Sequence, residues 1–235
     1  MGNGPLPPQN PAMNTSVIAA KADARGPFPR ARVDARMVEL WVFTVLLTLL
    51  NWPLFCGGNT DLFAFVPEQI RAGQWWRVIT HSFVHVSWYH FLLDAMAFLF
   101  LYQGLSSGKR WQRLGVVAAS IGGSLLAALW ISPELLSLYG LRGLSGVAHG
   151  LMLFSMLEML SVKHRDLQTK VIGLLGATAV FAKVLWEMYF DTAFFASFHL
   201  GLFGVPVVAC HAGGVLGAFL FWWTAKIRRR PSASA

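Results

Sequence analysis

The tetrapeptide Gly143-Leu144-Ser145-Gly146 opens an apolar segment, residues 143–162, which reads GLSGVAHGLMLFSMLEMLSV. A bilayer-spanning helix needs about 20 largely apolar residues, and this segment has that length. A serine flanked by glycines therefore stands at one end of a predicted transmembrane helix. Small residues at this spacing are also typical of close packing between membrane helices, so the tetrapeptide alone does not identify a catalytic serine.

Five other segments of the chain have the same apolar character. Hydrophobic residues make up 55% of the sequence and charged residues 13%, against a soluble norm of about 25% charged residues. The mean hydropathy of +0.53 also argues against an ordinary water-soluble protein. The sequence predicts an all-α membrane protein, a bundle of six transmembrane helices embedded in a lipid bilayer. The predicted spans are roughly residues 38–56, 82–104, 112–131, 143–162, 171–190 and 205–225.

The basic residues are distributed in a way that orients these spans. Of the 19 lysines and arginines, 15 precede the first span, separate the second from the third or the fourth from the fifth, or follow the sixth. Basic residues concentrate in cytoplasmic connections, so both chain termini are expected in the cytoplasm. The net charge of +8 is thus explained by membrane topology, and no nucleic-acid partner is expected.

Three parts of the chain follow from this pattern. Residues 1–36, rich in Pro, Gly, Asn and Ala, are predicted to form a disordered basic cytoplasmic tail. Residues 37–226 are predicted to form the six-helix membrane domain, and residues 227–235 a second cytoplasmic tail.

The orientation of the spans brings a serine and a histidine to the same depth. Spans four and six should both run inward, with Ser145 near the outer start of one and His211 near the outer start of the other. His90 and Asp94 should lie in the outer half of span two. Ionisable groups inside a membrane are costly and usually mark function. A serine next to a histidine is a nucleophile with its base, which favours peptide-bond hydrolysis within the membrane.

Four short motifs in this order resemble those of the rhomboid family of intramembrane serine proteases, over roughly residues 38–225. The short six-span body and the sequence GLSGVAHG most resemble the bacterial rhombosortase branch, which is associated with removing Gly-Gly-type C-terminal anchors from exported proteins. The motifs are Gln74-Trp75-Trp76-Arg77, residues 80–90 (THSFVHVSWYH), Gly143-Leu144-Ser145-Gly146 and Cys210-His211-Ala212-Gly213-Gly214.

The resemblance implies roles for individual residues. Ser145 would attack the scissile carbonyl, and His211 would act as its base in a dyad without a carboxylate. His90 would help to bind the oxyanion together with the Ser145 backbone N–H, with Gly143 of the nucleophile motif as a supporting residue. The loop 191–204 would border the site and gate substrate entry. No cofactor and no metal are implied, and the expected partners are transmembrane protein substrates.

Two positions depart from the family pattern. Asp94 stands where an Asn usually donates to the oxyanion, so it is either a neutral acid or the partner that holds His90 as an imidazolium, and we favour the second. His149 stands where many relatives have a Tyr beneath the catalytic histidine, and we expect it to support His211. Lys183 and Glu187, spaced i, i+4, are expected to form a buried ion pair that neutralises charge, with contact to a charged substrate terminus as the alternative.

The sequence therefore predicts an intramembrane serine endopeptidase that cleaves single-span substrates near the outer face of a bacterial cytoplasmic membrane. One alternative is a catalytically inactive rhomboid-like protein that binds membrane clients. Another is a metal-binding or transport protein that uses His81, His85 and His90, the first two placed on one predicted helix face. The oligomeric state is not predicted.

Overall fold

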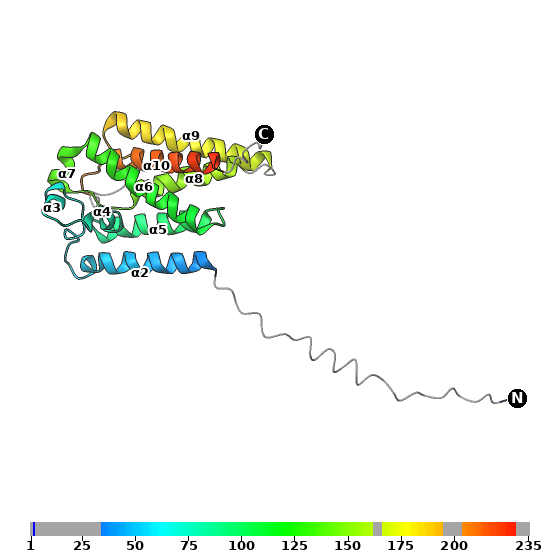
Figure 1. The fold of residues 1–235 in the computed structure, drawn as a ribbon, viewed down its shortest axis with the longest axis horizontal. Coiled ribbons are helices and arrows are strands. Elements are labelled where there is room, and N and C mark those ends of the chain that lie inside the picture. The colour runs from blue at the N-terminus through cyan, green and yellow to red at the C-terminus, as the bar shows by residue number, and fades with distance from the viewer. Residues whose placement is uncertain (1, 3–33, 162–165, 195–203, 229–235) are drawn as a thin grey trace. The chain divides into compact units, whose positions relative to one another are not determined.

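The computed structural model of the chain is helical and contains no β-strand within the residues it describes, which are 2, 34–161, 166–194 and 204–228. An isolated antiparallel bridge joins Phe65 to Leu141. The chain divides into two units, Met1–Asp34 and Ala35–Ala235, and the described helices all belong to the second (Figure 1). The predicted tails lie almost entirely outside the described residues.

Six long helices correspond to the six predicted spans. They are α2 (Ala35–Phe55), α5 (Trp88–Gly104), α6 (Arg110–Ile131), α8 (Ser145–Ser161), α9 (Leu167–Phe190) and α10 (Ala209–Ile227). Shorter helices lie in two of the connections: α3 (Pro67–Arg71), α4 (Arg77–Thr80) and the 3-10 helix η1 (His81–Phe83) before α5, and α7 (Pro133–Tyr139) before α8.

Within the described residues, three helices are long and apolar enough to cross a membrane on their own, namely α2, α6 and α9. A fourth span is added if the bent pair Arg77–Phe83 and Trp88–Gly104 is counted as one. The chain is therefore an integral membrane protein. The count of six spans, which would also require α8 and α10 to cross, stays a prediction.

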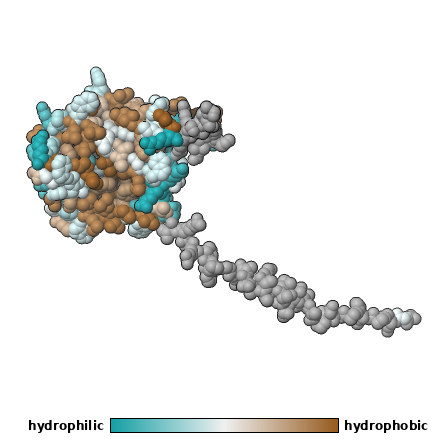
Figure 2. Space-filling model, viewed as in Figure 1, coloured by the Kyte–Doolittle hydropathy of each residue, from teal (hydrophilic) through white to brown (hydrophobic). Residues whose placement is uncertain are grey.

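The bundle has apolar side chains on its outside and polar side chains inside. Trp130 is 88% exposed and Phe100 is 80% exposed, whereas Asn51 and Ser120 are completely buried. Figure 2 shows apolar residues across the middle of the visible face of the helical unit, with hydrophilic residues gathered toward its two ends. A soluble protein rarely exposes so much contiguous apolar surface, whereas lipid tails cover such a surface at no cost.

The second predicted span is wrong at its start. Residues 82–87 do not continue the helix, because η1 and α5 meet at a bend of 91°. Ser87 has an extended backbone and its side-chain oxygen accepts the N–H of His90 at 3.1 Å, which caps the first turn of α5. His90 is thereby placed in the first turn of α5.

Helices α6, α8 and α10 pack very closely where glycines face one another (Figure 1). A Cβ atom added to Gly214 on α10 would lie 2.0 Å from the carbonyl oxygen of Gly146 on α8. A Cβ on Gly123 of α6 would lie 2.2 Å from the carbonyl oxygen of Gly213. Only glycine permits backbones to approach this closely, and Gly146 of the tetrapeptide takes part in this packing.

A buried ionic cluster joins α2, α5 and α6 at the end of the bundle where α5 terminates. Arg113 donates to both carboxylate oxygens of Glu39, each at 2.8 Å, and the Tyr102 hydroxyl donates to the same carboxylate at 2.7 Å. The guanidinium also donates to the backbone carbonyls of Ser107 and Gly108. These contacts fix the three helices relative to one another.

Candidate active site

Ser145 is the first residue of α8, and the loop before it fixes where the helix begins. Gly143 has a φ of +112°, a conformation that side chains other than glycine rarely adopt, and its N–H donates to the carbonyl of His81 at 3.1 Å. A Cβ on Gly143 would lie 3.1 Å from Oδ2 of Asp94. The expected span therefore starts at Ser145 rather than at 143, and Gly143 is required by its backbone conformation and close packing.

His211 meets Ser145 across the contact between α8 and α10. It is the third residue of α10, its side chain is buried, and its Nε2 lies 3.1 Å from Oγ of Ser145. Both residues stand in the first turn of their helices, so this contact requires α8 and α10 to begin at the same end of the bundle. The same direction was predicted for these two segments from the distribution of basic residues.

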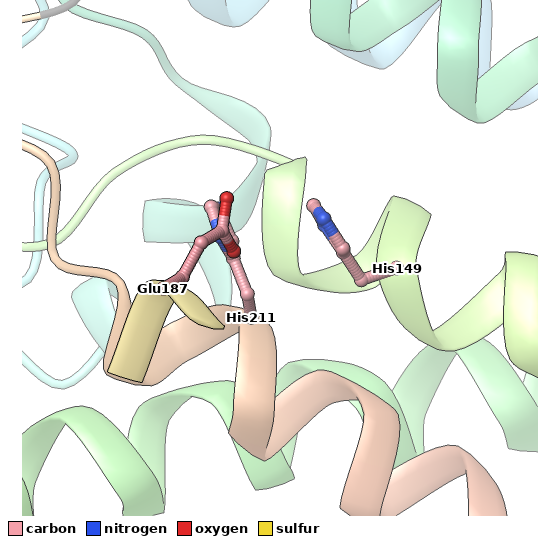
Figure 3. A group of neighbouring side chains, drawn as sticks. All are labelled: His149, Glu187 and His211. Atoms are coloured by element: carbon pink, nitrogen blue, oxygen red, sulfur yellow. The ribbon is translucent and has the colours of Figure 1, made fainter. Parts of the chain in front are cut away.

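A carboxylate lies on the other side of His211. Oε2 of Glu187 is 2.8 Å from Nδ1 of His211, and Oε1 of Glu187 is 2.5 Å from Nζ of Lys183. Glu187 is 1% exposed. The predicted ion pair between Lys183 and Glu187 is confirmed, but the expectation that His211 has no carboxylate partner is wrong. Figure 3 shows Glu187 and His211 side by side, on α9 and α10.

His149 stacks on His211 and forms hydrogen bonds with Ser145 and Lys183. The two imidazole rings lie 4.2 Å apart between centroids, with 17° between their planes. Nδ1 of His149 is 2.7 Å from the carbonyl oxygen of Ser145, and its Nε2 is 2.7 Å from Nζ of Lys183. A carbonyl only accepts and an ammonium only donates, so His149 carries its proton on Nδ1.

The same reasoning assigns the proton of His211. An ionised carboxylate only accepts, so Nδ1 of His211 donates to Glu187 and Nε2 is left as the acceptor that faces the Ser145 hydroxyl. The hydrogen bonds then run from Ser145 through His211, Glu187, Lys183 and His149 back to the Ser145 carbonyl. Chemically, this arrangement holds a neutral base against a hydroxyl group.

A second polar group lies beside the Gly143 loop. Oδ2 of Asp94 is 3.2 Å from Nε2 of His90 on the same helix, and 3.3 Å from Nε2 of His85. Asp94 therefore contacts His90, four residues earlier on α5, as the favoured interpretation of Asp94 expected. The carboxylate also has a second histidine, His85, next to it.

His85 belongs to a loop and not to a helix, which corrects another expectation. Its Nδ1 lies 3.1 Å from the side-chain oxygen of Asn51, whose amide donates to the carbonyl of Phe83 at 2.7 Å. His81 lies in η1 and contacts the carbonyl of Arg77 and the hydroxyl of Ser82. The two histidines do not share a helix face, so the geometry proposed for a metal pair is wrong.

A different trio of side chains has metal-ligand spacing. One ligand atom from each of His149, Glu187 and His211 lies within 4.8 Å of the others (Figure 3). However, the Lys183 ammonium already occupies this space, 2.7 Å from His149 and 2.5 Å from Glu187. A divalent cation would have to displace that charge, so the residues present fit an internal ion pair better than a metal.

The sequence did not predict two contacts of the site, namely that of Glu187 with His211 and that of His85 with Asp94. Glu187 is 24 residues before His211 and lies on another helix. Its position near the outer end of span five, at the depth expected for His211, was the available signal. His85 lacked a comparable signal because it lies beyond the bend. The expected gating loop 191–204 falls mostly outside the described residues, which include 191–194 and 204.

The fold and this geometry define a helical membrane protein with a half-buried serine and a buried histidine at the starts of two parallel helices, and a buried glutamate near the end of a third. The rhomboid domain model matches residues 72–228, more than half of the chain. The chain therefore belongs to the rhomboid family, whose members are intramembrane serine proteases. A search of curated proteins finds no significant match.

Proposed function

We propose that this protein is an intramembrane serine endopeptidase in which Ser145 is the nucleophile and His211 the general base. The observation that carries the proposal is the 3.1 Å contact between Oγ of Ser145 and Nε2 of His211. The distance is within hydrogen-bond reach, which a nucleophile and its base require. Membership of the rhomboid family supports the same chemistry.

The reaction follows from the tautomer of His211. Oγ of Ser145 attacks the scissile carbonyl carbon while its proton passes to Nε2 of His211. The tetrahedral intermediate collapses when that proton passes to the leaving nitrogen, which leaves an ester on Ser145. A water molecule then attacks the ester and gives a proton to His211. That proton returns to Oγ as the carboxylic acid leaves.

The negative charge of the intermediate needs donors. Ser145 begins α8, and the first backbone N–H groups of a helix have no acceptor within it, so the N–H of Ser145 is one proposed donor. His90 is the other. As the imidazolium that we propose, it has two N–H groups, one for the Asp94 carboxylate and one for the oxyanion. Asp94 thus acts through His90 in this proposal and does not face the oxyanion itself.

The expected substrates are single-span membrane proteins cleaved near the outer face. The distribution of basic residues supports cytoplasmic termini, and with them the starts of α8 and α10 would lie on the outer side of a bacterial cytoplasmic membrane. The resemblance of the Ser145 motif to the rhombosortase branch supports removal of Gly-Gly-type C-terminal anchors as the specific task. A helix must unwind to expose its backbone to Ser145, so small residues are expected at the cleavage site.

Labelling with a fluorophosphonate probe tests the chemistry. The purified wild-type protein should be labelled, and Ser145→Ala and His211→Ala should lose at least about 1000-fold in labelling rate. Labelling that persists in Ser145→Ala would assign the reactive group elsewhere. A folded wild-type protein that is never labelled would favour an inactive client-binding rhomboid, and metal-dependent folding would favour a metal protein.

Co-expression tests the substrate class. Exported proteins with a Gly-Gly-type C-terminal anchor should be released by the wild-type protein and stay anchored with Ser145→Ala. Release of single-span substrates without that anchor, with no preference for Gly-Gly, would contradict the rhombosortase assignment while leaving the protease intact.

A further inference from the structure

Glu187 makes two kinds of contact, and they divide between its two oxygens. Oε1 accepts the Lys183 ammonium at 2.5 Å and the Phe194 N–H at 2.9 Å, whereas Oε2 accepts Nδ1 of His211 at 2.8 Å. An ion pair between Lys183 and Glu187 that only neutralised charge would not need the contact between Glu187 and His211. Oε1 therefore fixes the position of the carboxylate, and Oε2 is the oxygen that contacts His211.

We propose that Glu187 is a positioning residue for His211, so that the site works as a Ser145–His211–Glu187 triad rather than a dyad. This inference rests on the proposed function. The Glu187 carboxylate keeps the proton of His211 on Nδ1 and directs the bare Nε2 at the Ser145 hydroxyl. Without that hydrogen bond, the buried imidazole would be free to adopt the other tautomer, whose Nε2–H cannot accept the serine proton.

Charge provides a second reason. His211 becomes a cation when it takes the proton of Ser145, in a buried place where the Lys183 ammonium is already present. Lys183 lies against His149, which stacks on His211. Without Glu187, these two positive charges would repel each other in a medium of low dielectric constant. The carboxylate lies between them and contacts both.

In this network of hydrogen bonds, Lys183 and His149 act on His211 indirectly, through Glu187. Lys183 holds Oε1 of Glu187, and His149 accepts from Lys183 while donating to the Ser145 carbonyl. The three helices α8, α9 and α10 are therefore linked by the same hydrogen bonds that orient the base. Figure 3 shows that His149, Glu187 and His211 come from these three helices.

The competing interpretation is that Lys183 and Glu187 form only a structural ion pair. A double variant distinguishes the structural ion pair from the positioning role. Lys183→Met with Glu187→Leu replaces the pair by apolar side chains of similar length, a change that is often neutral for the stability of buried pairs. If the pair is only structural, this variant should fold and cleave like the wild-type protein.

The positioning role predicts a different result. The double variant should melt within a few degrees of the wild-type protein, while its kcat falls at least about 100-fold and its KM changes less than about threefold. Glu187→Gln should show the same loss, because Lys183 and Phe194 both hold the amide oxygen and the NH2 group then faces His211. Lys183→Met, the matched control that keeps the carboxylate, should lose less kcat than either.

Nitrogen-15 spectra of histidine-labelled protein in micelles give a readout that does not depend on cleavage, with His211→Phe used to assign the signals. His211 should be protonated at Nδ1 in the wild-type protein and should lose that preference in the double variant. A double variant that retains wild-type kcat, or that keeps the Nδ1–H form, overturns the inference. If the wild-type protein cleaves nothing but the tautomer depends on Glu187, the positioning role stands and the proposed protease function fails.

Discussion

Two buried glutamates stand at opposite ends of the bundle, and their partners differ. Glu39 is 4% exposed and is bonded by Arg113 and Tyr102, while Glu187 is 1% exposed and is bonded by Lys183 and His211. The Glu39 carboxylate connects α2 with α5 and α6, whereas the Glu187 carboxylate connects α9 with α10 and reaches α8 only through Lys183 and His149. In the first cluster, both carboxylate oxygens accept from a guanidinium that is always charged. In the second, one oxygen accepts from an imidazole whose other nitrogen faces a hydroxyl group.

Because of this difference, we expect the Glu39 cluster to contribute to stability and the Glu187 cluster to contribute to catalysis. The bidentate pair between Arg113 and Glu39 holds helices together through a guanidinium that is always charged. In the proposed mechanism, His211 of the Glu187 cluster gains and loses a proton. We therefore expect substitutions at the first cluster to change stability, and substitutions at the second to change activity in protein that is still folded.

The largest expected effect comes from breaking the Glu39 cluster. Arg113→Met leaves the Glu39 carboxylate buried without its main partner, which should cost about 3–5 kcal/mol in the free energy of unfolding. Denaturation in mixed micelles measures that loss, and cleavage per folded molecule should be unchanged.

Arg110 provides the matched control. Its guanidinium is 3.4 Å from the same carboxylate, but its side chain is 69% exposed. Arg110→Met should cost less than about 1 kcal/mol. Equal losses for Arg110→Met and Arg113→Met would mean that burial of the pair is not what stabilises this end of the bundle.

Substitution of Asp94 tests the role proposed for the polar group beside Ser145. Asp94→Ala removes the partner of His90 and should lower kcat about 100-fold to 1000-fold, the range seen when one oxyanion donor is lost. Asp94→Asn can still hold His90, so it should remain active with an altered pH dependence of cleavage. Full activity of Asp94→Ala at every pH would contradict the role given to His90 and Asp94.

The smallest expected effect concerns the glycine contact between α6 and α10. Gly123→Ala places a Cβ where Gly213 lies, which should cost about 1–3 kcal/mol through overpacking. The neighbouring Gly122 has nothing within 4 Å of its Cβ position, so Gly122→Ala should not be destabilising. Similar losses in both variants, measured by unfolding in micelles, would show that glycine matters here for backbone flexibility and not for close approach.

The sequence predicted much of the fold because membrane helices follow simple rules of length and charge. Apolar segments of about 20 residues correspond to the six long helices, and the basic residues gave α8 and α10 a common direction. The bend between η1 and α5 was missed because hydropathy does not register the direction of a chain. Residues 82–87 were counted in the predicted span, and the extended backbone at Ser87 shows that α5 begins later.

The candidate site was predictable where its residues lie at helix starts or at fixed spacing on one helix. Ser145 and His211 were found from their depth, and the roles of His90 and Asp94 came from the resemblance to the rhomboid family. Glu187 and His85 act across helices, and a sequence does not tell which face of α9 turns toward α10 or how a loop folds back. Contacts of this kind depend on how helices are rotated against one another, which side-chain packing decides.

By itself, the sequence determined that Ser145 and His211 stand at one depth of a membrane protein, because hydrophobic length and basic charge fix where a helix begins and which way it runs. The tertiary structure decided that Glu187 is the third member of this group. The close approach of glycine-lined helices rotates α8, α9 and α10 so that the two imidazoles, the ammonium and the carboxylate meet. A buried carboxylate requires such partners, and only the packed bundle supplies them.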